Sequence, residues 1–256
     1  MRHIKRLLAL ALTYCLVADP AWAVWSVANL RSSGNPWNHC ATCHTITFTT
    51  NVVVPANALI ILFFNARGTN ASTETFSGGD GGDTFTSKPC VGTTNTNFSG
   101  VLYAVSAGGL ASGATITFSL VSGLNATDIQ FTGAYATGGL TSSPEDTSVA
   151  ACNSGTATIS PTVTSGTPSQ SGDLIVSSYA NFATGFTFIE DATWTATFSA
   201  SDSNAGVAGA YINNAGSGTK TRSPVSDSTA YAMNTVGFKL AGVAPASHSL
   251  MFQSVP

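Results

Sequence analysis

The chain has 256 residues, of which 43% are hydrophobic and only 8% are charged, and its formal net charge is −3. This low charge excludes a protein that binds nucleic acid through a strongly basic surface. Glycine is frequent, as are Ser, Thr, Ala and Asn, and this composition is typical of exported β-proteins and surface components rather than of cytoplasmic enzymes.

The first predicted element is a signal peptide over residues 1–23. A basic start, MRHIKR, precedes the apolar run LLALALTYCLVA, and a small-x-small cleavage site follows at Ala21-Trp22-Ala23. The apolar run is shorter than the roughly 20 residues that a membrane-spanning helix needs, and no later apolar stretch is longer. We therefore expect cleavage near Ala23, a secreted protein in the periplasm or outside the cell, and no membrane span.

The rest of the chain has the pattern of strands and turns. β-Branched residues punctuated by Gly, Asn, Asp and Ser dominate, and no long stretch has helical spacing. Residues 58–64 form a continuous apolar run that predicts a strand buried on both faces, whereas residues 114–120 alternate between apolar and polar. In chain order, the predicted strands are residues 45–50, 58–65, 84–86, 100–106, 114–121, 129–136, 156–164, 174–180, 186–189, 194–199, 208–212 and 230–240.

Three segments of the first half are echoed in the same order in the second half. PANALIILFFN resembles QSGDLIVSSYAN, VLYAV resembles GAYIN, and DIQFTGAYA resembles NTVGFKLA. The pattern suggests an internal duplication, with half-sets of strands over about residues 45–136 and 156–240. We expect one all-β domain over residues 24–256, a two-sheet antiparallel β-sandwich of jelly-roll type, because each half alone would leave an apolar sheet face uncovered. Two separate small sandwiches are the alternative.

Several short motifs resemble those of a loose group of exported bacterial β-sandwich proteins. These motifs are the A-x-A-cleaved leader, an early Trp, a Cys pair before a Thr-rich strand, N-A-L-I-I, a Gly/Asp turn, L-Y-A-V, S-G-D-L-I-V and the closing V-G-F-K. Proteins of this group are concanavalin-like or jelly-roll in appearance and mostly without known function. The resemblance implies a fold and a compartment, carries over no catalytic residues, and implies that the early cysteines form disulfides.

The cysteines allow two interpretations. Cys15 leaves with the signal peptide, and an even number in an oxidising compartment favours disulfides, for which three pairings are possible. The remaining cysteines, all disulfide candidates, are Cys40, Cys43, Cys90 and Cys152. In the alternative, Cys40 and Cys43 attach a haem and Cys90 pairs with Cys152.

The haem alternative rests on the C-x-x-C-H motif. Cys40 and Cys43 would form thioethers with the haem vinyl groups, and His44 would be the proximal iron ligand. The candidates for the sixth iron ligand are Met233, His248 and Met251. A predicted strand begins immediately after His44, whereas small cytochromes usually present this motif on a helix, so a structural disulfide is favoured and no cofactor is expected.

Other candidate sites are weaker. Residues 78–86, GGDGGDTFT, match a calcium-binding nonapeptide, in which Asp80 and Asp83 would supply oxygen ligands, but one copy favours a glycine-rich turn. Trp37 and Trp194 could stack on sugars if they line a groove. A G-x-S-x-G elbow is missing from the sequence, and the acidic pairs Glu145-Asp146 and Glu190-Asp191 would point to opposite faces of a strand.

These observations favour a non-catalytic protein over an enzyme. The leading hypothesis is a secreted binding or structural module at the cell surface, whose partner is a polysaccharide or another extracellular polymer. The alternatives are a monohaem electron carrier that uses Cys40, Cys43 and His44, and an extracellular hydrolase with an unrecognised carboxylate site. The oligomeric state is left open.

Overall fold

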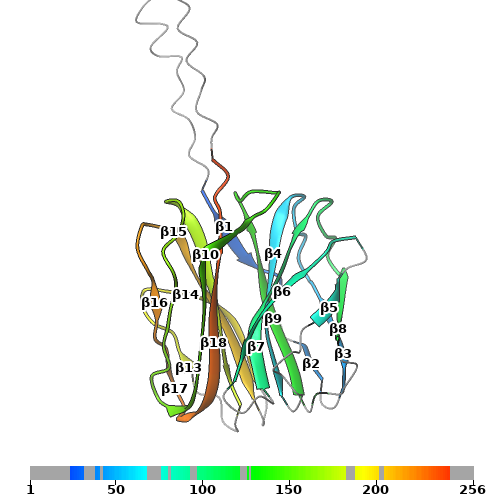
Figure 1. The fold of residues 1–256 in the computed structure, drawn as a ribbon. Coiled ribbons are helices and arrows are strands. Elements are labelled where there is room, and N and C mark those ends of the chain that lie inside the picture. Colours follow the sequence, from blue (N-terminus) through cyan, green and yellow to red (C-terminus); the bar gives the residue numbers. More distant parts are fainter. Residues whose placement is uncertain are drawn as a thin grey trace, which may run out of the picture.

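The computed structural model describes residues 24–31, 38–40, 43–67, 76–79, 82–92, 97–121, 126, 128–182, 188–201 and 205–242 (Figure 1). The predicted signal peptide lies outside these residues. Within the described ranges, no helix is long and apolar enough to cross a membrane. All strands pair antiparallel, which confirms the prediction of an all-β protein.

The described residues form eighteen β-strands, which are numbered in chain order. The strands of the first half are β1 Ser26–Asn29, β2 Asn38–Cys40, β3 Thr45–Thr49, β4 Ala58–Arg67, β5 Phe76–Gly79, β6 Thr86–Val91, β7 Asn97–Ser106, β8 Thr115–Leu120 and β9 Asp128–Thr137. Those of the second half are β10 Glu145–Thr158, β11 Val163–Thr164, β12 Asp173–Asn181, β13 Phe188–Ile189, β14 Thr195–Ser201, β15 Gly206–Ala215, β16 Thr221–Arg222, β17 Val225–Ser226 and β18 Thr229–Phe238.

Two large sheets form the centre of the molecule. The first has the strand order β1-β9-β4-β7-β6, with β2 also paired to β9, and the second has the order β10-β18-β12-β15-β14. A three-stranded sheet, β3-β8-β5, covers the outer face of the first large sheet, and the two-stranded sheets β11-β16 and β13-β17 cover that of the second. Figure 1 shows these layers side by side, with the second half on the left.

Apolar side chains fill the spaces between the layers. The cluster between the two large sheets includes Leu59, Ile61, Phe63, Val176 and Val236, all nearly inaccessible to solvent. A larger, phenylalanine-rich cluster lies between the first large sheet and the sheet β3-β8-β5. β4 is therefore buried on both faces and β8 on one, as predicted from their apolar run and their alternation.

The halves of the chain are not intertwined within a sheet. Among the described strands, each sheet takes all its members from one half of the chain, and there are five sheets instead of the two that the sequence predicts. The sandwich-like packing is confirmed, but it involves more layers than two. The reason is that both faces of each large sheet are apolar, so each needs a cover on its outer side.

The two large sheets have corresponding strand orders. β9, β4 and β7 stand in the same order as β18, β12 and β15, which are the segments whose sequences echo one another. The contacts between the sheets follow the same correspondence, since β7 meets β12 as β15 meets β4, and β6 meets β18 as β14 meets β9. The two halves therefore pack with approximate two-fold symmetry.

Sequence patterns located the inner strands better than the outer ones. The predicted strand at 156–164 was wrong, because it straddles the end of β10 and the separate short strand β11. β6 follows the predicted strand at 84–86 and contains Pro89, and β10 begins with Glu145-Asp146-Thr147-Ser148. Both are edge strands, where proline and polar residues are tolerated and the apolar signal is weak.

Candidate functional site

The outer strands of the two large sheets meet along one side of the molecule. β6 and β10 lie against each other without sharing a hydrogen-bond ladder. A disulfide between Cys90 and Cys152 joins them, with Cα atoms 5.5 Å apart. We call this contact zone the seam and define it by Lys88, Cys90, Glu145 and Cys152. The disulfide settles the pairing of two of the candidate cysteines.

A bulge in β10 opens an apolar cavity at the seam. Asp146 stands opposite Gly237 and Ala151 opposite Thr235, so residues 147–150 face Val236 alone. Bulges of this kind occur often beside functional sites because they bend a strand and remove part of the ladder. The cavity has a volume of about 290 Å³. Its lining includes Lys88, Pro89, Ala150, Ala151 and Val236.

A second, polar cavity lies along the same side, between the 82–86 segment, β7 and the turn at 141–144. Its volume is about 460 Å³. Hydroxyl and carboxylate side chains dominate its lining, namely those of Asp83, Thr84, Thr86, Tyr103, Thr141 and Ser143. These groups both donate and accept hydrogen bonds, and therefore the cavity has the chemistry to bind a ligand rich in hydroxyl groups.

Glu145 contacts one lining residue of each cavity. Its Oε2 accepts a hydrogen bond of 2.7 Å from the Tyr103 hydroxyl, and its Oε1 lies 2.8 Å from Lys88 Nζ. Burial raises the pKa of Tyr103 well above its usual range, and the hydrogen bond to Glu145 acts in the same direction. Tyr103 therefore stays protonated and donates to Glu145 across the physiological pH range. The carboxylate, the ammonium and the phenol hold each other in fixed positions.

The cysteine motif lies at the entrance of a strand, as expected. His44 is exposed in the bend before β3, and its carbonyl accepts a hydrogen bond of 2.7 Å from the Leu120 amide. Cys43 is disulfide-bonded, and a sulfur in a disulfide cannot also form a thioether with haem. Cys40 belongs to β2, and its side chain lies outside the described part.

The other residues of the haem alternative give it no support. Met233 is fully buried among the side chains that pack between the second large sheet and its cover. His248 and Met251 lie outside the described residues. The haem interpretation stays a prediction without structural support.

The calcium interpretation stays a prediction. Asp83 is half-buried and lines the polar cavity, whereas Asp80 lies outside the described residues. In the part of the chain that the structure describes, no group of three or more His, Cys, Asp and Glu side chains is placed to hold a metal ion.

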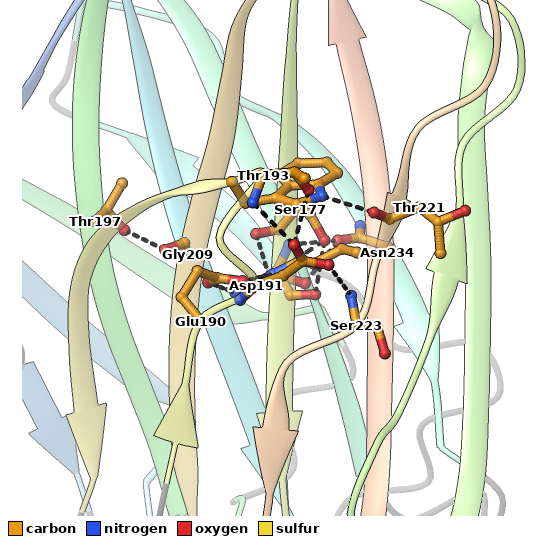
Figure 2. Close-up of polar contacts among 12 residues, drawn as sticks. Ser177, Glu190, Asp191, Thr193, Thr197, Gly209, Thr221, Ser223 and Asn234 are labelled. Atoms are coloured by element: carbon orange, nitrogen blue, oxygen red, sulfur yellow. Dashed lines mark hydrogen bonds and ion pairs between the residues drawn. The ribbon is translucent and has the colours of Figure 1, made fainter.

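Trp194 plugs the core instead of lining a groove. Its side chain is 5% exposed, and its Nε1 donates a hydrogen bond of 2.9 Å to the Thr221 carbonyl. The neighbouring turn is fixed by Asp191, whose Oδ1 accepts from the amide and hydroxyl of Thr193 and whose Oδ2 accepts from the Ser223 amide (Figure 2). Trp37, the other predicted stacking residue, lies outside the described residues.

Both side chains of the acidic pair Glu190-Asp191 form polar contacts near this turn. Glu190 forms a two-pronged ion pair with Arg222, at 3.0 Å to Nε and 2.6 Å to Nη2. Arg222 is fully buried, lies over the Phe188 ring and also donates to the Ser177 carbonyl. Figure 2 shows Glu190 and Asp191 beside Ser177 of β12, where they fasten the outer cover to the second large sheet.

Comparisons with protein-family models, curated proteins and solved structures find no match. The group of exported β-sandwich proteins that the short motifs resemble therefore stays a prediction. The seam cavities are the candidate site on geometry alone. Of the residues proposed from the sequence, the structure places Asp83 at a cavity and Cys90 and Cys152 at the seam.

Proposed function

We propose that this protein is an exported, non-catalytic binding module that holds a neutral, hydroxyl-rich surface polymer along the seam. The polar cavity lined by Tyr103 and four Ser or Thr residues is the observation that carries the proposal. Sugar hydroxyl groups both donate and accept hydrogen bonds, and the lining offers both functions. The adjoining apolar cavity receives the apolar face of a sugar ring or an apolar substituent.

A neutral polymer fits the electrostatics of the seam better than a charged one does. Lys88 and Glu145 neutralise each other at 2.8 Å. The protein also carries few charged residues elsewhere, so long-range attraction of a polyanion or polycation is weak. A location outside the cytoplasm is supported by the disulfide between Cys90 and Cys152, because such bonds persist in oxidising compartments.

The connectivity supports a finer description of the fold. In the first half, strands β3 and β5 belong to the small sheet and β4 and β6 to the large one, so the chain alternates between two layers as in a jelly roll. The second half alternates in the same way through β11 to β14. We infer that the chain is a duplicated jelly-roll-like unit. Superposition of strands β1–β9 on strands β10–β18 in a crystal structure tests this inference.

Bulky substitutions in the polar cavity test the proposal. Thr84 and Thr141 are exposed in its lining, so Thr84→Trp and Thr141→Trp fill the cavity without disturbing the core. We expect polysaccharides retained by the wild type in pull-down and calorimetry to bind these variants at least about 10-fold more weakly, a loss of about 1.4 kcal/mol.

Thr115→Trp is the matched control, because Thr115 is also an exposed threonine but lies on β8 in the small sheet. It should bind like the wild type. A wild-type protein that retains none of a broad panel of neutral glycans would defeat the proposal. Equal binding by all three variants would exclude the polar cavity as the site.

A further inference from the structure

A buried pair of carboxyl groups lies one residue beyond the seam. Asp146 follows Glu145 on β10 and points to the opposite side, and Asp173 begins β12. Their exposed fractions are 2% and 0%. Asp146 stands opposite Gly237 of β18, and Ile175, two residues after Asp173 on β12, stands opposite Gly237 from the other side. The two carboxyl groups therefore lie on the same face of the sheet, and each is among the groups that shift the pKa of the other. Two carboxyl groups that are buried close together do not both ionise readily, so one of them keeps its proton to a higher pH than an isolated carboxyl group does.

Asp146 fixes the start of the β10 bulge. Its Oδ1 accepts hydrogen bonds from the amide and hydroxyl of Ser148, at 3.1 and 2.7 Å, and its Oδ2 accepts one of 2.6 Å from the Ser169 amide. The Ser148 hydroxyl also donates to the Thr167 carbonyl at 2.7 Å. The bulge that opens the apolar cavity is therefore attached to the 165–172 loop through Asp146.

Asp173 connects the same loop to the end of β18. The Leu240 amide donates a hydrogen bond of 3.4 Å to Asp173 Oδ1, and Gln170 Nε2 donates one of 3.0 Å to the Leu240 carbonyl. The carboxyl pair thus joins three segments that the sheet ladders do not hold together. These are the bulge of β10, the 165–172 loop and the residues that follow β18.

The surroundings shift the pKa values of the two carboxyl groups in opposite directions. Burial raises the pKa of Asp173 from its ordinary value of 3.8 to about 6, and the hydrogen bond and charge of Asp146 act in the same direction. Burial alone would also raise the pKa of Asp146, but hydrogen bonds from Ser169 and Ser148 lower it below its usual range. Below about pH 6, Asp173 therefore carries the proton and Asp146 carries the charge.

Asp146 is the charged group that acts on Asp173. On the elements packed around the pair, Glu145 is held by Lys88 and Tyr103, and Lys220 Nζ donates to the Ser217 carbonyl. Lys239 follows β18, and residues 159–172 contain no charged residue.

We propose that the Asp146–Asp173 pair is a pH-sensitive latch, which holds the β10 bulge and the apolar cavity in place while the pair carries one proton. When that proton leaves, two buried carboxylates repel each other and the three segments loosen. The effect on ligand binding rests on the function proposed above, whereas the effect on the fold does not.

The sign of the pH dependence follows from the raised pKa. The folded state binds the Asp173 proton more tightly than the unfolded chain does, so stability from Asp173 is complete below pH 3.8. It declines as the pH rises toward about 6 and is lost above that value. Asp146 acts in the opposite sense, since its contribution is lost as the pH falls below 3.8.

Thermal melts of the wild type and Asp173→Asn from about pH 4 to pH 8 test the latch. The asparagine amide donates to Asp146 as the protonated acid does, but it cannot ionise. We expect the wild-type Tm to fall relative to that of the variant by on the order of 5 °C between pH 4 and 7. Above pH 7 the two curves of Tm against pH should run parallel. Parallel curves over the whole range would overturn the latch.

Asp191→Asn is the control, because Asp191 also accepts amide hydrogen bonds, but the bond from the Thr193 amide lowers its pKa instead of raising it. Its Tm should differ from that of the wild type by a constant amount above about pH 5, and the difference should narrow only at more acidic pH, where the wild-type carboxylate takes up its proton. If Asp173→Asn does not fold, wild-type hydrogen exchange decides, since amides at 165–172 should gain protection at pH 5 relative to pH 7.5 after correction for intrinsic rates. Unchanged protection would equally contradict the latch.

Ligand binding separates the two proposals. A retained polysaccharide should bind the wild type more tightly at pH 5 than at pH 7.5, and Asp173→Asn should lose this difference. If no glycan binds at either pH, the proposed function fails while the melts still decide the latch. If binding is independent of pH although the melts behave as expected, the latch holds the fold but does not regulate the seam, and the coupling is refuted.

Discussion

Two ion pairs of this protein differ in burial, and burial decides how much each contributes to stability. The side chain of Arg222 is 0% exposed and that of Glu190 is 11% exposed, whereas the Lys88 side chain in the seam is 34% exposed. A pair near the surface contributes about 1 kcal/mol or less, because water screens it. Removing one partner of a buried pair costs far more, since the other charge is left without compensation.

Glu190→Ala should therefore lower the free energy of unfolding by about 3–5 kcal/mol, measured by urea denaturation. The guanidinium of Arg222 would keep its bonds to Ser177 but lose the carboxylate. The double variant Glu190→Ala, Arg222→Met removes both charges and should recover much of the loss. A single variant within about 1 kcal/mol of the wild type would show that water compensates the guanidinium.

At the same scale, the acidic dipeptides show what sequence reasoning can establish. Neighbouring strand residues point to opposite faces, and Glu145 and Asp146 do so, toward Tyr103 and Asp173 respectively. The rule argues against the dipeptide as a catalytic couple by itself. The rule could not identify these partners, because Asp173 and Tyr103 are far from the dipeptide in the sequence. Tyr103 also belongs to the other large sheet.

At the scale of strands, the packing of the two large sheets depends on one close approach. Gly209 of β15 lies directly against the Phe63 ring of β4, and a Cβ atom there would overlap the ring. Gly209→Ala should cost about 1–3 kcal/mol in the free energy of unfolding, because the sheets or the ring must shift.

Gly216→Ala is the matched control for this prediction. No heavy atom lies within 4 Å of its Cβ position, and its φ lies outside the left-handed region. Its stability should stay within about 0.5 kcal/mol of the wild type. If both variants unfold at the same urea concentration, the contact between Gly209 and Phe63 does not limit the packing of the sheets.

The strands also explain why the all-β class and the inner strands could be predicted from the sequence and the site could not. β4 and β12 are buried on both faces, so their apolar runs are clear. The seam is built by edge strands, whose polar residues and Pro89 resemble a turn. The pairing of Cys90 with Cys152 was one of several possibilities, since strand neighbours are fixed by the whole fold rather than by local pattern.

For the whole molecule, the two halves are held together by the apolar interface between the large sheets and by the seam. Cleavage at an engineered protease site inserted at Ser142, which is exposed in the 141–144 turn, should leave the halves associated. The disulfide joins them covalently, and after reduction the buried cluster around Phe63 and Val176 still does.

Gel filtration of the cleaved protein, with and without reductant, measures this association. We expect one peak in both cases and separation only when urea is added with reductant. Separation by reductant alone would mean that the apolar interface is too weak without its covalent link. Uncleaved protein treated with the same reductant is the control.

The approximate two-fold relation between the halves has a consequence for valency. A symmetric pair would present two equivalent clefts, one at each pair of outer strands. Where β6 carries Lys88 and Cys90, its counterpart β14 has the sequence TATFSAS, without a basic or sulfur-containing residue. The chemistry of the seam thus occurs once in the described strands. One molecule of the proposed binding module would then have a single binding site for a repeating polymer. Cross-linking of polymer chains would require several copies of the protein.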